Sequence, residues 1–149
     1  MNTNPSPAIV PAGRVLHGFG EEVVFHLTGN ETNGQLTTWM EIIPPGGGPP
    51  LHYHENEDEY FVVLEGKVSF FQNNQWTEVG PGGAVFLPRN SVHAFKNTGD
   101  QTSRMMVTAT PSGFENFFAR CAEEFAREDG PNMAEIVRIA NEHGIHFVK

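Results

Sequence analysis

Short runs of β-branched and aromatic residues, separated by glycine, proline and asparagine, occupy the chain from Arg14 to Thr110. This alternation of apolar runs and turn residues is typical of β-strands joined by tight connections. Glu65-Gly66 and Asn73-Asn74 stand where hairpin turns are expected, because glycine and asparagine tolerate positive φ. Many short strands at this spacing predict an antiparallel sandwich or barrel. The expected strands are Glu22–Thr28, Gln35–Ile43, Leu51–His54, Glu59–Leu64, Lys67–Phe71, Gln75–Glu78, Ala84–Leu87, Val92–Lys96 and Ser103–Thr110.

The period of the apolar residues changes after Thr110, where a helical stripe replaces the strand pattern. Ser112-Gly113-Phe114-Glu115 has the form of a capping box that opens a helix, and Gly130-Pro131 ends it. Asn132 can cap a second helix, and Gly144 is a natural residue beyond its end. The stripe on the first helix consists of Phe114, Phe117, Phe118, Cys121, Ala122 and Phe125.

The chain therefore divides into an N-terminal arm (1–13), a β-barrel (14–110) and a C-terminal extension of two helices (111–149). We find no internal repeat and no linker long enough to separate two domains. A chain of 149 residues suits one domain, which buries roughly 70% of the surface that its unfolded form exposes.

The composition argues against several classes of partner. The net charge of −9 repels phosphate backbones and anionic lipid, so we expect no nucleic acid and no membrane as partner. Cys121 is the only cysteine, so no intramolecular disulfide is possible and nothing indicates an oxidising compartment. The first residues lack the basic and apolar segments of a signal peptide, and we expect a cytoplasmic protein.

His52-Tyr53-His54 lies on an expected strand, so its two imidazoles share one face. Such a pair alone is more often two surface histidines than a metal site. Glu59 follows at the head of another strand, and His93 comes later, beyond a proline. Together these side chains would suit Fe, Mn, Ni, Co, Cu or Zn. Glu57 has the same strand parity as Glu59, so alternation does not choose between the two carboxylates.

The combined spacing resembles the two motifs of the cupin family. Gly46-x5-His52-x-His54-x4-Glu59-x6-Gly66 is similar to the first motif, and Gly82-x5-Pro88-x4-His93-x3-Asn97 to the second. The resemblance implies a double-stranded β-helix (jelly-roll) barrel, all-β apart from the two C-terminal helices. It also implies one divalent transition metal held by His52, His54, Glu59 and His93, and thus selects Glu59 over Glu57. The family's usual glycine in Pro-x-Gly is Asn90 here, and asparagine best tolerates the left-handed region.

With a Gly-Phe-x-x-Phe-Phe stretch after the barrel, the chain is most similar to quercetin-dioxygenase-like monocupins. That resemblance implies a dioxygenase whose metal holds the oxygen of a small enolisable or aromatic, flavonol-like substrate beside dioxygen. Glu59 would then be both ligand and general base. An apolar barrel with other carboxylates nearby is expected to raise the proton affinity of Glu59.

Two alternatives stay open, a non-oxidative metal-dependent isomerase or lyase and a small-molecule-binding cupin without turnover. Neither the ligand set nor the barrel separates them from the dioxygenase. The phenylalanine stripe after Thr110 would be a large apolar patch if exposed, so it must be covered by the barrel, by a second copy, or by both. Since barrels of this family commonly pair through edge strands, we predict a homodimer.

Overall fold

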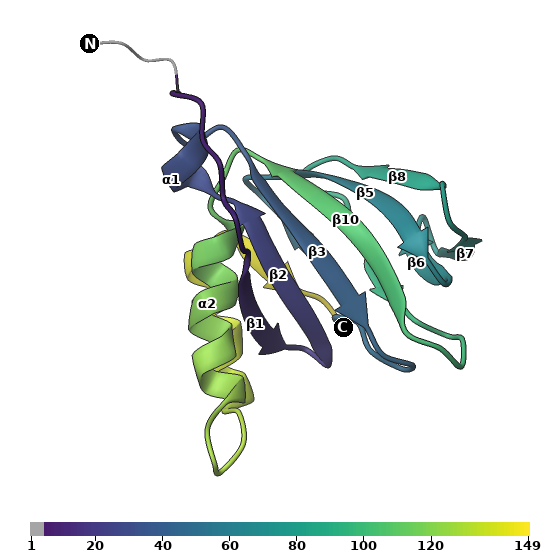
Figure 1. Ribbon diagram of the computed structural model, residues 1–149. Helices are drawn as coiled ribbons and strands as arrows, with labels where there is room; N and C mark the ends of the chain where they lie inside the picture. The colour runs from purple at the N-terminus through teal and green to yellow at the C-terminus, as the bar shows by residue number, and fades with distance from the viewer. Residues whose placement is uncertain (1–4) are drawn as a thin grey trace.

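A computed structural model describes residues 5–149 of the protein. Residues 1–4 of the expected N-terminal arm lie outside this range. A six-stranded antiparallel sheet has the order β1-β2-β3-β10-β5-β8, and two smaller sheets have the orders β7-β6-β9 and β11-β4 (Figure 1). The strands are β1 (Arg14–Gly18), β2 (Glu21–Leu27), β3 (Thr37–Ile43), β4 (His52–His54), β5 (Asp58–Glu65), β6 (Val68–Gln72), β7 (Gln75–Val79), β8 (Ala84–Leu87), β9 (Ala94–Lys96), β10 (Ser103–Thr110) and β11 (Ile145–Phe147).

The predicted β-barrel with a helical C-terminal part is confirmed. In β3 and β10 every second residue is buried, as expected for strands that turn one face to a core. Two backbone hydrogen bonds between His52 and His93, each 2.9 Å long, join the β11-β4 pair to the sheet that contains β9. The smaller sheets thereby form the second wall of the barrel.

The predicted turn residues adopt the left-handed conformations that their positions require. Asn73 and Asn74 have φ of 51° and 61°, and Gly66 has φ of 71°. Asn90, at the position where the family pattern has glycine, has φ of 70°. The asparagine therefore preserves this turn, which leads the chain toward His93.

The helices are α1 (Gly29–Thr32), α2 (Phe114–Phe125) and α3 (Met133–Glu142). The capping box predicted at Ser112 is wrong, because the N-cap of α2 is Gly113 and no side chain caps it. Glu115 instead accepts three hydrogen bonds of 2.7 Å, from the N–H groups of Gly29 and Gly113 and from the Thr37 hydroxyl. It therefore ties the start of α2 to the barrel. The predicted cap at Asn132 is confirmed, because its Oδ1 accepts hydrogen bonds from the N–H groups of Ala134 and Glu135.

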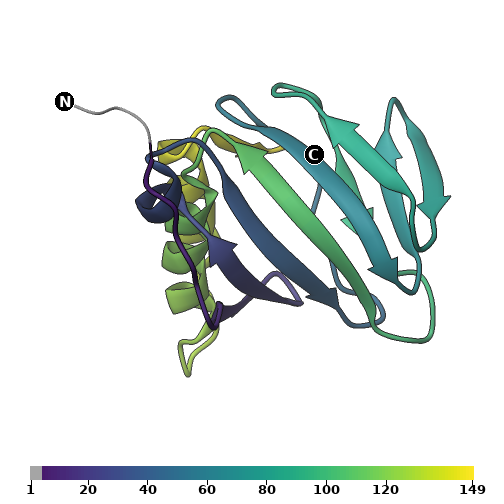
Figure 2. The same cartoon turned by 45° about the horizontal axis from the view of Figure 1, so that its top comes forward.

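The phenylalanine stripe of α2 is covered within one chain. Phe114, Phe117 and Phe118 are buried, and α2 lies beside β1 at the side of the barrel opposite the β6–β7 hairpin (Figures 1 and 2). The stripe therefore needs no second copy to cover it. No helix among residues 5–149 is long and apolar enough to cross a membrane.

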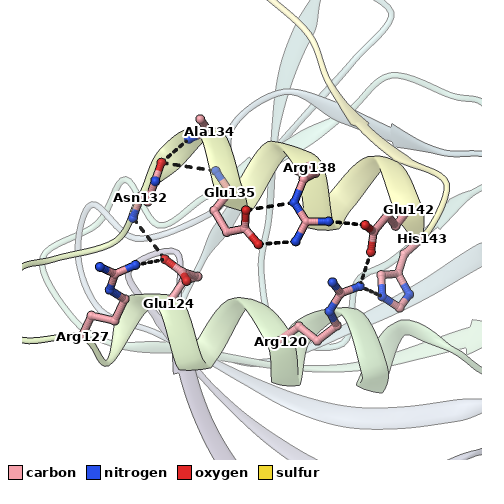
Figure 3. A network of polar contacts seen from close by, with 9 residues as sticks. All are labelled: Arg120, Glu124, Arg127, Asn132, Ala134, Glu135, Arg138, Glu142 and His143. Carbon is pink, nitrogen blue, oxygen red and sulfur yellow. Dashed lines mark hydrogen bonds and ion pairs between the residues drawn. The ribbon is translucent and has the colours of Figure 1, made fainter.

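Polar contacts join α2 to α3 on the side of the helix pair away from the core (Figure 3). Arg120 lies 2.6 Å from a Glu142 oxygen and 3.1 Å from the His143 ring, while Arg138 bridges Glu135 and Glu142 within α3. Water and salt screen such exposed pairs, so they add little to stability. The apolar stripe therefore contributes most to holding the helices on the barrel.

Two strands fall outside the sequence-predicted set. β1 pairs with β2 at the edge of the large sheet, and β11 follows α3 and pairs with β4. In the β11–β4 pair, Phe147 lies opposite His52 and Ile145 lies opposite His54. The end of the chain therefore supports the strand that carries two of the candidate metal ligands.

Candidate metal centre

The structure brings the four predicted ligand residues to one point inside the barrel. His52 and His54 come from β4, Glu59 from β5, and His93 directly precedes β9. One ligand atom from each lies within 4.8 Å of all the others, and all four side chains are buried. Alternation along β4 turns both imidazoles inward, as the sequence pattern predicts.

Each imidazole is held from behind through Nδ1. The Nδ1 atoms of His52 and His93 lie 2.8 Å and 2.9 Å from the carbonyl oxygens of Pro50 and Ser91. Since a carbonyl oxygen only accepts, these contacts fix Nδ1 as the protonated nitrogen and leave the Nε2 lone pair free. His54 Nδ1 lies 3.1 Å from Glu57 Oε2 in the same way. This is the arrangement in which metal-ligating histidines are commonly oriented.

Three of the converging atoms are buried polar atoms without a hydrogen-bond partner among the described residues. They are Nε2 of His54, Nε2 of His93 and Oε1 of Glu59. Glu59 Oε1 lies 3.0 Å and 3.4 Å from the two nitrogens. A buried polar atom without a partner is costly, and a cation between these atoms would satisfy all three. The donor set thus fits a divalent transition metal.

Glu57 and Glu59, which strand parity does not distinguish, have different places in the structure. Glu59 is the carboxylate that faces the three imidazoles, whereas Glu57 lies behind His54. The difference arises because Glu57 precedes the first residue of β5 and its side chain reaches back to β4. Both carboxylates are buried.

The expectation that burial raises the proton affinity of Glu59 is wrong. Burial does raise the pKa of this carboxyl, but the neighbouring imidazoles, His54 first and then His93 and His52, outweigh it and lower the pKa to about 2. Burial and the neighbouring imidazoles lower the pKa of His52 to about 3. Glu59 is therefore an anion and His52 a neutral imidazole at neutral pH, the forms in which each binds a metal.

The cavity beside this cluster is small and largely aromatic. Its volume is about 30 Å³, whereas pockets that hold drug-sized ligands measure roughly 300–1,000 Å³. Phe114, Phe117 and Phe118 of α2 close it, and Phe114 stacks on Trp39 with ring centroids 4.3 Å apart. In this conformation the cavity accommodates water-sized molecules but no flavonol.

A larger hollow of about 840 Å³ lies on the surface between β1 and α2. Phe19 and Glu21 line both this groove and the metal-site cavity, and so form the wall between them. Phe19 is half-buried and has φ of 55° between two glycines, a conformation that is uncommon for a bulky residue. The β1–β2 turn is thus the barrier between the metal site and the groove.

Sequence reasoning missed two cavity residues, Glu21 and Glu41. Both are buried carboxyls, with 6% and 2% of their surface exposed. Glu41 alternates with Trp39 and Ile43 on the inner face of β3, which is the signal that could have revealed it. A charged residue at an inward strand position indicates either a functional site or a specific polar partner.

Comparison with known proteins agrees with this geometry. Residues 39–109 match the cupin domain family. Quercetin 2,3-dioxygenase of Bacillus subtilis is 30% identical over 94 residues, a match that covers 63% of this chain but only 28% of that protein. An oxalate-binding protein of Thermotoga maritima is 31% identical over 86 residues, covering 56% of this chain and 70% of the other.

Among solved structures, the polyketide cyclase RemF of Streptomyces resistomycificus has a TM-score of 0.57 and 26% sequence identity. The match covers 74% of this chain and 76% of that protein. The matched family region contains all four converging ligand residues and the strands that carry them. The chain belongs to the cupin family.

Proposed function

We propose that this protein is a metal-dependent dioxygenase that acts on a small enolisable or aromatic substrate. The observation that carries the proposal is the convergence of three imidazoles and Glu59 on a buried point beside an aromatic cavity. A metal held there by four protein ligands would have one or two further coordination positions for a substrate, as catalytic metal sites do. Fe, Mn, Ni, Co, Cu and Zn all suit this ligand set.

A bound ion of this kind would supply Lewis acidity toward a substrate oxygen and, if it is redox-active, the means to activate dioxygen. His52, His54 and His93 hold Nδ1 against a carbonyl or carboxylate oxygen and direct Nε2 toward Glu59, and Glu57 fixes the orientation of His54. Glu59 is ionised and so is able to accept the proton of a substrate hydroxyl. Because the pKa of Glu59 is low, it accepts the proton only from a substrate hydroxyl whose own pKa is lowered in the site.

The volume of the cavity restricts the substrate. A ring-sized molecule does not fit into about 30 Å³, so we infer that it enters when the Phe19 side chain moves and joins the cavity to the groove. Phe19 packs on four other phenylalanines, Phe117, Phe118, Phe125 and Phe147. These apolar contacts are not directional, so the ring is able to change position without breaking a hydrogen bond.

The similarity to a quercetin dioxygenase supports oxidation, whereas the similarity to a polyketide cyclase favours a second candidate, a non-oxidative reaction at the same site. Oxygen uptake separates the two. We expect metal-loaded protein to consume dioxygen with an enolisable hydroxy-ketone, and the His52→Ala/His93→Ala variant to consume none. Conversion of the substrate in strictly anaerobic buffer, at the aerobic rate, would instead establish the non-oxidative reaction.

A further inference from the structure

Two carboxyls that take no part in the metal cluster line the same cavity. Glu21 on β2 and Glu41 on β3 are at least nine-tenths buried, and neither belongs to the group of atoms that converge on the metal point. Their neighbours on the inner faces of these strands are apolar: Val23, Phe25, Trp39 and Ile43 are all buried. The sequence therefore places two acids where strand alternation calls for core residues.

Glu21 and Glu41 have too few hydrogen-bond partners among the described residues. Glu41 Oε1 accepts a hydrogen bond of 2.9 Å from the Trp39 indole, and Glu21 and Glu41 can share one hydrogen bond when one of them is protonated. Apart from each other, Oε2 of Glu41 and Oε2 of Glu21 are buried without a partner among the described residues. One proton shared by the two carboxyls uses only part of their capacity to accept hydrogen bonds, because each carboxyl offers about four lone-pair sites. A buried polar atom without a partner is unfavourable, and a bound ligand that hydrogen-bonds to these oxygens would remove that cost.

The protonation of the pair indicates what it can bind. Burial and the proximity of Glu41 raise the pKa of Glu21 well above its usual range, and burial raises the pKa of Glu41 to about 7. The pair therefore retains a proton at neutral pH and offers both a donor and an acceptor. A hydroxyl group matches this combination, whereas a carboxylate oxygen would face carboxyl oxygens and be repelled.

The surroundings of the pair restrict the ligand further. The cavity walls are aromatic, with Trp39 stacked on Phe114, and suit a flat ring. A cationic ligand would face a metal ion that Glu59 neutralises only in part. Glu21 also lines the surface groove, so it lies on the path past Phe19.

We propose that Glu21 and Glu41 form a recognition subsite that binds a hydroxyl group of an uncharged aromatic or enolic ring and excludes carboxylate anions. This inference rests on the proposed function, since it assigns the other end of the same substrate. The ring lies with one hydroxyl at the carboxyl pair and its enolic oxygens toward the metal cluster. The subsite thus separates hydroxylated rings from dicarboxylates such as oxalate.

A binding experiment tests the subsite without turnover. Protein loaded with Zn²⁺ in anaerobic buffer is titrated with 5-hydroxy-2-(hydroxymethyl)-4-pyranone and with its 2-methyl analogue, which lacks one hydroxyl on the far side of the ring. We expect wild-type protein to bind the first about tenfold more tightly, the size of one good hydrogen bond. The preference should vanish in Glu21→Met/Glu41→Met, which keeps the shape of the side chains but removes their polar atoms.

The Glu21→Gln/Glu41→Gln variant separates charge from hydrogen bonding. It should keep the preference for the hydroxymethyl compound but bind oxalate about tenfold more tightly than wild-type protein does, because the amides carry no charge. Glu78→Gln, an exposed carboxylate on β7 at the side of the barrel opposite α2, is the matched control and should change neither affinity. An unchanged hydroxyl preference in the methionine variant, unchanged oxalate affinity in the glutamine variant, or no binding of either pyranone would overturn the subsite. Oxygen uptake does not enter these readouts, so they stand apart from the test of the dioxygenase.

Discussion

Oε2 of Glu57 lies 3.1 Å from Nδ1 of His54, on the side of the imidazole that faces away from Glu59. One histidine is thus held between two carboxylates, one in front and one behind. The pKa of His54 reflects this arrangement: burial lowers it, but the charges of Glu59 and Glu57 and the hydrogen bond of Glu57 outweigh burial and raise it. Glu57 therefore fixes the ring and increases its basicity as a ligand.

Loss of Glu57 should weaken metal binding without removing a ligand. We expect Glu57→Ala to lower the affinity for Zn²⁺ by about 10–100-fold, the usual effect of removing a carboxylate behind a ligating histidine. Competition with a chromogenic chelator measures it. Glu55→Ala is the matched control, because Glu55 is an exposed neighbour that pairs with His146. Equal affinities in the two variants would refute the orienting role of Glu57.

Removal of the histidine ligands should empty the site and leave the barrel folded. Purified wild-type protein should carry about one equivalent of transition metal, and His52→Ala/His93→Ala close to none. The barrel should persist because its apolar core surrounds Phe61, Val63 and Met105 and does not depend on an ion. Elemental analysis and circular dichroism give the two readouts. Full metal occupancy in the double variant would show that other residues bind the metal.

Glu59→Gln should separate metal binding from catalysis. The amide keeps one oxygen ligand but neither the charge nor the ability to accept a proton, so we expect a substantial part of the metal to remain. Oxygen uptake should fall by about 10²-fold or more, the low end for the loss of a general base. Activity at the wild-type level in metal-loaded Glu59→Gln would disprove the base assignment.

Phe19→Ala should open the wall between the groove and the metal cavity. We expect the association rate of a ring-sized hydroxypyranone to rise severalfold, because access no longer waits for the ring to move. The substitution removes packing on four phenylalanines, and a free energy of unfolding lower by about 1–3 kcal/mol is expected for a half-buried ring. Stopped-flow absorbance with Phe86→Ala, an exposed phenylalanine, as control measures the rate. An unchanged association rate would place the entrance elsewhere.

The homodimer stays a prediction, although the buried stripe of α2 no longer requires it. Tyr60 and Phe86 stand opposite each other on β5 and β8, and 48% and 60% of their surfaces are exposed at the open edge of the large sheet. Light scattering over a wide range of protein concentration should give twice the chain mass of 16.5 kDa. A monomer mass throughout would exclude the dimer.

Sequence alone determined most of the barrel and all four converging residues. Strand alternation and turn residues depend on local stereochemistry, so β3, β10 and the Asn73-Asn74 turn were readable from short segments. The ligand spacing was readable because it repeats a family pattern. Local reasoning also foresaw that Asn90 would serve in place of glycine.

Tertiary structure alone decided how the site is completed. Glu57 and Glu59 are equivalent by parity, and the family pattern selects Glu59 as the ligand. The place of Glu57 behind His54 follows only from the path of the chain between β4 and β5. The pairing of β11 with β4, the closure of the cavity by α2, and the meeting of Glu21 with Glu41 beside the metal point join segments far apart in the chain. Such contacts depend on how the elements pack against one another, which the local pattern of apolar and polar residues does not encode.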